Sequence, residues 1–199
     1  ENPVGMPSNI KLVSYGNEYS DLPYFLEDMV GLRIKEAMNK RPLIGVSPYK
    51  TVRCATDVLQ RYHYSLQQLP FCGRIEEMNQ LRNFLDKDQK FLWWAITGQA
   101  GAGKSRLALE LLKRSTGSWF GFFINDKATQ EDFDSFEPFN NTVIVIDYVA
   151  GREGFVANAI RSIKEKFENV DYKARILLLE RENSRNASSW YYKLIQRIG

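Results

Sequence analysis

The residues with the clearest chemical meaning lie in a glycine-rich segment near the middle of the 199-residue chain. The segment GQAGAGKS at residues 98–105 matches the phosphate-loop (P-loop, or Walker A) pattern G-x-x-x-x-G-K-[ST]. Glycines let the backbone curl so that successive N–H groups point at one anion, and a helix beginning there adds the positive end of its dipole. Lys104 would reach the β- and γ-phosphates, and the Ser105 hydroxyl would ligate magnesium. The segment therefore predicts a site for ATP or ADP with Mg²⁺.

The nucleotide contacts predicted in this segment share one loop and the start of one helix. They are Gly98, Gln99, Ala100, Gly101, Ala102, Gly103, Lys104, Ser105 and Arg106.

A carboxylate that ends an apolar run is the second candidate. Residues 141–147 read NTVIVID, the pattern of a buried strand that ends in Asp147. An acid at this place lies beside a phosphate loop and holds magnesium through water. A strand can also end in aspartate because the turn needs it, but the phosphate loop favours the metal role. We predict Ser105 and Asp147 as metal-binding residues, and Lys104, Asp147 and Arg181 as the catalytic set.

Hydrolysis requires more than nucleotide binding. A polar residue must orient the attacking water, and a cation must offset charge on the γ-phosphate. Tyr148 stands where many ATPases place a second acid. The candidates for orienting water are therefore Glu153, Glu180 and Glu182. Arg181 is the candidate cation because neighbouring strand ends in a parallel sheet face the same crevice, although a plain surface arginine is the alternative.

Hydrophobic periodicity predicts the elements that position these residues. Four short apolar runs, typical of buried parallel strands, lie at residues 91–96, 119–124, 143–146 and 176–179. Apolar residues at helical spacing predict helices at residues 76–85, 104–114, 155–167 and 188–198. A helical crossover between the last two strands favours a parallel sheet. The expected fold class is α/β, a parallel-sheet P-loop NTPase core with helices on both faces, preceded by a small helical segment.

The first third of the chain has a different character. After an irregular lead-in, helical spacing predicts helices at residues 22–38 and 51–66. We assign residues 1–69 to a helical connector or the end of an upstream domain, and residues 70–199 to the P-loop domain.

Four segments together resemble the STAND class of signal-transducing P-loop ATPases, relatives of the AAA+ group and of nucleotide-binding domains in immune sensors. They are FCGRIEE at residues 71–77, the phosphate loop, the strand ending in Asp147, and the strand end at Arg181. The stretches WWAITG, IDY and LLLERE look like bacterial STAND-type NTPases within larger defence or signalling proteins. The resemblance covers residues 70–199 and implies that Phe71, Gly73 and Arg74 line an adenine pocket.

The resemblance also implies partners and a mode of action. Family members continue into a helical lid, a winged-helix domain and ligand-sensing repeats, so the expected partners include these segments of the same protein. The expected function is an ATP/ADP switch that hydrolyses slowly and controls homo-oligomerisation. Two departures from the family pattern, Ile75 after Arg74 and Tyr148 in place of an acid, bear on hydrolysis. A P-loop kinase for a small molecule or nucleotide, and a non-hydrolysing nucleotide-binding module, remain as alternatives.

Composition narrows the remaining classes. The net charge of the chain is +3, and the basic residues are scattered among acidic ones, so nucleic acid is not a predicted partner. The two cysteines, Cys54 and Cys72, lack metal-ligand spacing, which is typical of a reduced cytosolic protein. The longest apolar stretch, residues 91–96, is far below the roughly 20 residues that a membrane span needs. We expect a cytoplasmic protein with no membrane partner.

Overall fold

The computed structural model describes residues 45–46, 70–124, 127–181 and 189–199. The chain divides into two compact units, residues 1–39 and residues 40–199, and every described residue belongs to the second. The helices expected at residues 22–38 and 51–66 lie outside the described residues. The domain boundary expected at residue 70 stays a prediction.

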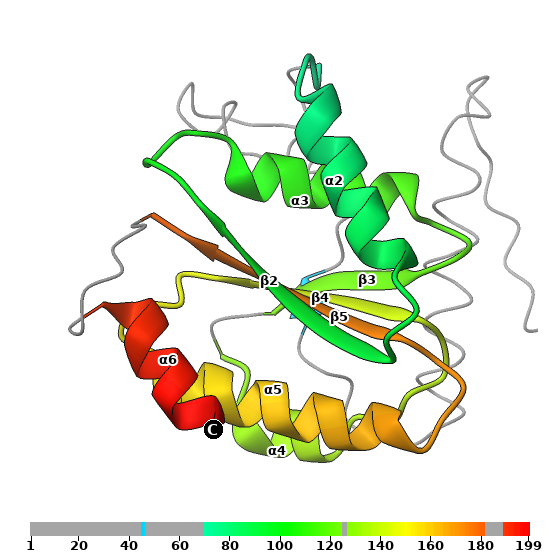
Figure 1. Cartoon of the computed structure of the whole chain (residues 1–199), viewed down its shortest axis with the longest axis vertical. Coiled ribbons are helices and arrows are strands. Elements are labelled where there is room, and N and C mark those ends of the chain that lie inside the picture. The colour runs from blue at the N-terminus through cyan, green and yellow to red at the C-terminus, as the bar shows by residue number, and fades with distance from the viewer. Residues whose placement is uncertain (1–44, 47–69, 125–126, 182–188) are drawn as a thin grey trace, which may run out of the picture. The chain divides into compact units, whose positions relative to one another are not determined.

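A five-stranded sheet forms the centre of the second unit (Figure 1). In sheet order its strands are β1 (Gly45–Val46), β3 (Phe120–Ile124), β4 (Thr142–Asp147), β5 (Ala174–Glu180) and β2 (Phe91–Thr97). The strands β3, β4, β5 and β2 run parallel to their neighbours, and β1 pairs antiparallel with β3. The predicted parallel α/β fold is confirmed. The short strand β1 comes from the segment assigned to a connector, so this part of it belongs to the sheet.

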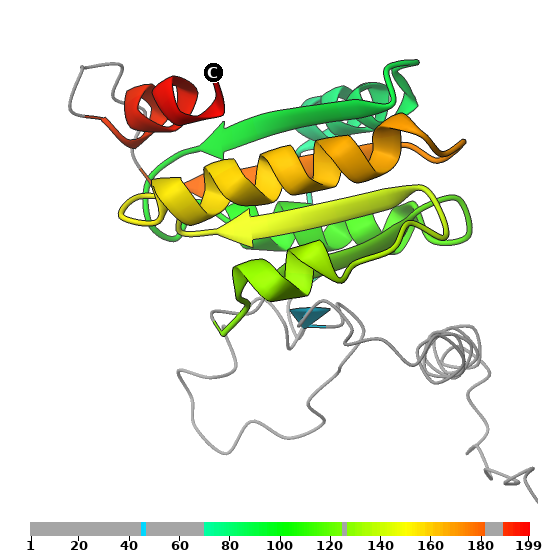
Figure 2. The same ribbon diagram turned by 90° about the horizontal axis from the view of Figure 1, so that it is seen from below.

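Helices cover both faces of the sheet, as Figures 1 and 2 show. On one face lie α2 (Ile75–Asp86) and α3 (Lys104–Arg114), and on the other lie α4 (Gln130–Asp134), α5 (Glu153–Glu168) and α6 (Trp190–Ile198). The helix α4 was not predicted, because five residues are too few to show a helical stripe. A capping box between Thr129 and Asp132 begins it.

The core is two apolar layers separated by the sheet. In β4, Val143 and Val145 pack with α2 and α3, whereas Ile144 and Ile146 pack with α5 on the other face. These side chains are at most 1% exposed. The alternation follows from the two-residue period of a strand, and it explains why the central strands are apolar at every position. Each such side chain stabilises the fold by about 1.5 to 3 kcal/mol.

Strand β2 differs from the buried strand that the sequence predicts. It stands at one end of the strand order, all its residues are partly exposed, and the Trp94 side chain is 36% exposed. Trp93 packs against the layer under α5, and Trp94 meets the Phe84 ring edge-on at 5.4 Å between centroids. The two tryptophans therefore attach an edge strand to both layers. Apolar content alone does not distinguish an edge strand from a central one when large rings cover it.

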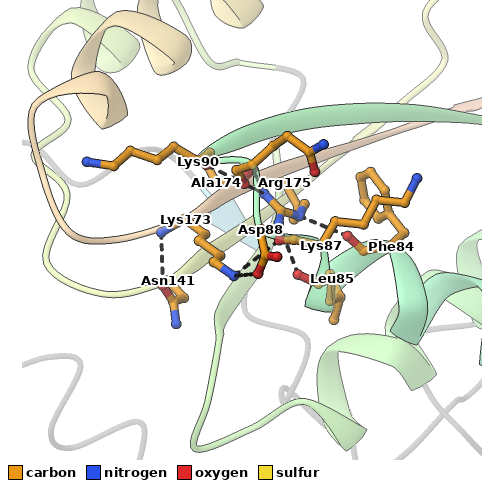
Figure 3. A network of polar contacts seen from close by, with 10 residues as sticks. Phe84, Leu85, Lys87, Asp88, Lys90, Asn141, Lys173, Ala174 and Arg175 are labelled. Carbon is orange, nitrogen blue, oxygen red and sulfur yellow. Dashed lines mark hydrogen bonds and ion pairs between the residues drawn. The ribbon is translucent and has the colours of Figure 1, made fainter.

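Arg175, near the beginning of β5, is a buried arginine that forms hydrogen bonds with the end of α2 and with the segment between α2 and β2 (Figure 3). Arg175 is 0% exposed and carries most of this contact. Its guanidinium donates hydrogen bonds of 2.5 to 3.1 Å to the carbonyl oxygens of Phe84, Leu85, Lys87, Gln89 and Ala174.

The bonds to Phe84, Leu85 and Lys87 satisfy carbonyl groups at the end of α2, where the last carbonyls have no helical partner. Desolvation lowers the pKa of Arg175, and the negative charge of Asp86 partly opposes that shift. The rings of Phe84 and Trp119 lie 5.7 and 5.4 Å from the guanidinium carbon. Arg175 is thus both the C-terminal cap of α2 and a packing element of the core.

Candidate functional site

The sheet register brings the candidate residues to one edge. Thr97 pairs with Glu180, and Asp147 pairs with Leu179, so β2, β4 and β5 end at nearly the same level. The chain leaves these three strand ends in the glycine-rich loop (residues 98–103), the turn at Tyr148 and the turn at Arg181. Side chains far apart in sequence therefore meet at the carboxyl edge of a parallel sheet, where such folds bind ligands.

The glycine-rich loop is a tight turn between β2 and α3. The N–H of Ala102 donates to the carbonyl of Gln99 at 3.2 Å, and α3 begins with the Leu107 N–H bonded to the Gly103 carbonyl at 2.9 Å. Gly101 and Gly103 have φ angles of +74° and +79°, in the left-handed region. A side chain there costs about 1 to 2 kcal/mol, so both positions favour glycine. The first N–H groups of α3, which have no acceptor within the helix, therefore lie next to the glycine-rich loop.

The first turn of α3 supplies two polar side chains at the loop. The Lys104 ammonium donates to the carbonyl oxygens of Gly98 at 2.7 Å and of Gln99 at 3.0 Å, so it lies over the loop's own backbone. The Ser105 hydroxyl donates to Oδ2 of Asp147 at 2.6 Å. Residues 42 positions apart are thus in direct contact. Magnesium prefers oxygen ligands at about 2.0 to 2.1 Å and accepts one or two from protein, so this oxygen pair fits such an ion.

The segment before α2 also reaches the loop. Arg74 precedes α2 with a left-handed backbone (φ +55°), and its guanidinium donates to the carbonyl of Ala102. Gly73 has φ +71°. The Phe71 ring packs among the residues of α2 and α3 and lies 5.5 Å from the guanidinium carbon of Arg114. Of the three residues implied for an adenine pocket, Arg74 contacts the glycine-rich loop directly.

Three other predicted nucleotide contacts lie on α3 or in the glycine-rich loop. Arg106 lies 3.7 Å from Glu110 one turn along α3. Gln99 and Ala100 are exposed at the tip of the glycine-rich loop. Helical spacing explains the first case, because residues four apart on a helix are neighbours.

Arg181 lies along the side chain of Tyr148. The guanidinium carbon is 5.3 Å from the centre of the Tyr148 ring, and the guanidinium donates to the phenol oxygen at 3.4 Å. The Tyr148 ring is 54% exposed. Tyr148 also has a left-handed backbone, φ +57°, and its N–H donates to Asp147 Oδ1 at 3.0 Å. The cation predicted at this edge is therefore stacked beside the residue that follows Asp147.

Glu180 is the only predicted water-orienting residue at the strand ends that the structure describes in detail. It is 6% exposed, and its two carboxylate oxygens accept the backbone N–H groups of Arg181 and Ala150 at 2.6 and 2.7 Å. Glu153 is the first residue of α5, and Glu182 lies outside the described residues. Sequence reasoning missed this anchoring, although a carboxylate directly after four apolar strand residues was a signal that it is buried.

The described residues hold no group of three or more His, Cys, Asp or Glu side chains that could bind a metal by themselves. A magnesium ion at Ser105 and Asp147 would complete its coordination with phosphate and water oxygens. Within the part of the chain that the structure describes, no helix has the length and apolar character to cross a membrane.

Comparison with known proteins yields little for this chain. No family model matches it, and no curated protein matches it. A solved structure of PCH-2 from C. elegans is similar over 91% of this chain and 68% of the PCH-2 chain, with 11% sequence identity and a TM-score of 0.41. A likeness this distant supports no statement about the site. The strand order and register themselves show a parallel α/β protein, in which Ser105, just after the glycine-rich loop, contacts Asp147 at the carboxyl edge of the sheet.

Proposed function

We propose that this chain binds ATP or ADP with Mg²⁺ and acts as the switch module of a STAND-type signalling or defence ATPase. One observation carries the proposal: the Ser105 hydroxyl lies 2.6 Å from the Asp147 carboxylate, directly beside the glycine-rich loop. A glycine-rich turn that matched the pattern by chance would have no reason to bring its serine to an acid at the end of β4, which β5 separates from β2 in the sheet.

Each residue has a role that follows from its place. The loop N–H groups and the start of α3 bind phosphate oxygens. Lys104 exchanges its bonds to the Gly98 and Gln99 carbonyls for bonds to phosphate, and so neutralises phosphate charge. Ser105 and Asp147 hold the metal, which offsets the remaining charge when it is bound. Recognition of the base is assigned to Phe71, Gly73 and Arg74.

Slow hydrolysis is part of the proposal. Tyr148 carries no carboxylate, and both oxygens of Glu180 already accept N–H groups, so neither is well suited to deprotonate or orient water. Arg181 is the cation assigned to the γ-phosphate. The same observation favours a second candidate, a module that binds nucleotide without hydrolysing it. The expected chemistry is tight binding with little turnover.

The switch is assigned to the contact between α2 and the glycine-rich loop. Arg74 donates to the carbonyl of Ala102, so a change in loop position alters the start of α2. Lid, winged-helix and sensor segments of the same protein are the partners that would respond. A nucleotide-dependent change in oligomeric state would be seen by light scattering with ADP or with a non-hydrolysable ATP analogue.

The test of binding compares the wild-type chain with Lys104→Ala. Loss of a charge-assisted contact predicts affinity for Mg-ATP about 10- to 100-fold lower. Lys164→Ala, on the exposed face of α5, is the matched control and should bind as the wild type does. Calorimetric titration measures affinity, and phosphate release over hours measures turnover. Failure of the wild type to bind, or equal binding by the two variants, would refute the proposal, and transfer to an added acceptor would indicate a kinase.

A further inference from the structure

Glu180 is a buried carboxylate at the carboxyl edge of the sheet. It is the last residue of β5 and is 6% exposed. A carboxylate taken out of water is unfavourable unless hydrogen bonds replace its hydration. An apolar residue could form the last position of β5 equally well. The presence of a buried carboxylate there therefore needs a separate explanation.

Its hydrogen bonds join three separate segments. Oε1 accepts the N–H of Arg181 at 2.6 Å, and Oε2 accepts the N–H of Ala150 at 2.7 Å. The main-chain carbonyl of Glu180 accepts the N–H of Gly98 at 3.2 Å. Short bonds to an ionised acceptor are among the stronger hydrogen bonds in proteins. One residue thus connects the start of the glycine-rich loop, the turn after Asp147 and the turn that carries Arg181.

The turn after Asp147 is strained, which makes this connection important. Tyr148 has a left-handed backbone, a conformation unfavourable for a residue with a large side chain. Such strain persists only where surrounding contacts over-determine the conformation. Here the Tyr148 N–H donates to the Leu179 carbonyl at 3.1 Å, and Glu180 holds Ala150 two residues further on. The same turn places the Tyr148 N–H against Oδ1 of Asp147, whose Oδ2 accepts from Ser105.

We propose that Glu180 is a positioning residue for nucleotide recognition: its carboxylate holds Asp147 and Arg181 in one arrangement around the phosphate site. The inference rests on the proposed function and deepens it. Glu180 touches no substrate in this role, since both of its oxygens are engaged by backbone N–H groups. Because the proposed function assigns Arg181 to the γ-phosphate, the property most sensitive to Glu180 is the preference for ATP over ADP.

The deciding variant is Glu180→Gln. The glutamine side chain has nearly the same shape as glutamate. Its NH₂ group, however, is a donor and replaces one of the two carboxylate oxygens that accept a backbone N–H. We expect the ratio of ADP to ATP dissociation constants to fall by about tenfold, since one charge-assisted bond is lost and Arg181 shifts. Glu165→Gln on the exposed face of α5 makes the same chemical change and should leave the ratio as it is in the wild type.

A double-mutant cycle separates positioning from general support of the fold. If Glu180 acts through Arg181, then Glu180→Gln adds nothing to the ratio once Arg181→Ala is present. Additive effects would show that Glu180 acts independently of Arg181 and would overturn the inference. Should Glu180→Gln fold poorly, Glu180→Asp keeps the charge but is too short to reach both N–H groups, and its ratio should lie between those of the wild type and Arg181→Ala.

Hydrogen exchange gives a readout that does not depend on nucleotide. The N–H groups of Ala150 and Arg181 should exchange faster in Glu180→Gln than in Glu165→Gln, while those of β4 stay protected. Unchanged exchange, or an unchanged ratio in a wild-type background that binds Mg-ATP, would overturn the inference alone. A wild-type chain that binds no nucleotide would instead count against the proposed function. In that case, faster exchange in Glu180→Gln would show that Glu180 anchors the two turns but has no role in nucleotide recognition.

Discussion

Two arginines at opposite ends of β5 have the same side chain and different surroundings. Arg175, near the beginning of the strand, is 0% exposed and donates to five carbonyl oxygens at 2.5 to 3.1 Å. Arg181, just past the end, is exposed, and its guanidinium lies against the Tyr148 ring and phenol. The first has its hydrogen-bonding capacity used by the fold. The second contacts only Tyr148 through its side chain among the described residues, and this exposure is what distinguishes a candidate functional arginine from a structural one.

The backbone shows the same contrast. Among the described residues, the non-glycine residues with positive φ are Arg74 and Tyr148, and both lie at the carboxyl edge of the sheet. Strained backbone tends to occur at functional sites, because the surrounding structure there holds a conformation that folding alone would not choose. Among the described residues, the strained non-glycine backbone therefore lies at the carboxyl edge of the sheet and not at the Arg175 end.

The largest effect is expected at the structural end. Arg175→Met should lower the free energy of unfolding by about 3 to 5 kcal/mol, because several buried carbonyl groups lose their donor. Urea denaturation measures the change. Arg175→Lys retains the charge but not the planar fork, so its loss should be smaller than that of Arg175→Met. Stability equal to the wild type in Arg175→Met would show that the carbonyl bonds contribute nothing and would remove the contrast between the two arginines.

A smaller effect of opposite sign is expected at Tyr148. Tyr148→Gly should raise the free energy of unfolding by about 0.5 to 1 kcal/mol, because glycine adopts a left-handed backbone without steric cost. The gain is reduced by the larger entropy of glycine in the unfolded chain. Tyr148→Ala removes the ring and keeps Cβ, so it serves as the control and should show no gain. If the alanine variant were the more stable of the two in urea, the turn would not be strained.

The smallest change in stability is expected for Arg181→Met. An exposed arginine with one stacked ring should contribute less than about 0.5 kcal/mol to the free energy of unfolding. The affinity of the Arg181→Met variant for Mg-ATP should nevertheless fall relative to its affinity for Mg-ADP. Folded Arg175→Lys should have the same ratio of the two affinities as the wild type. Urea denaturation and calorimetric titration on the same samples make the comparison. A large loss of stability with unaltered nucleotide preference would place Arg181 in the same structural class as Arg175.

Local features of the sequence predicted much of the fold and part of the site. The helix expected at residues 104–114 is α3, and the four expected strands lie within two residues of β2, β3, β4 and β5. The glycine-rich segment and the acid at the end of β4 could be recognised because short-range backbone geometry and strand periodicity depend on neighbouring residues. The five-residue helix α4 has too short a pattern to be recognised in this way.

Only the tertiary structure decided which distant groups are partners. The amino-acid types at 175, 180 and 181 did not indicate which groups these residues contact: Arg175 caps α2, Glu180 joins three turns and Arg181 stacks on Tyr148. The edge position of β2 and the pairing of β1 with β3 were equally hidden. The physical reason is that strand order and register depend on packing between segments many residues apart. Sequence spacing determines which chemistry each element carries, and the register of the sheet determines which of those groups meet.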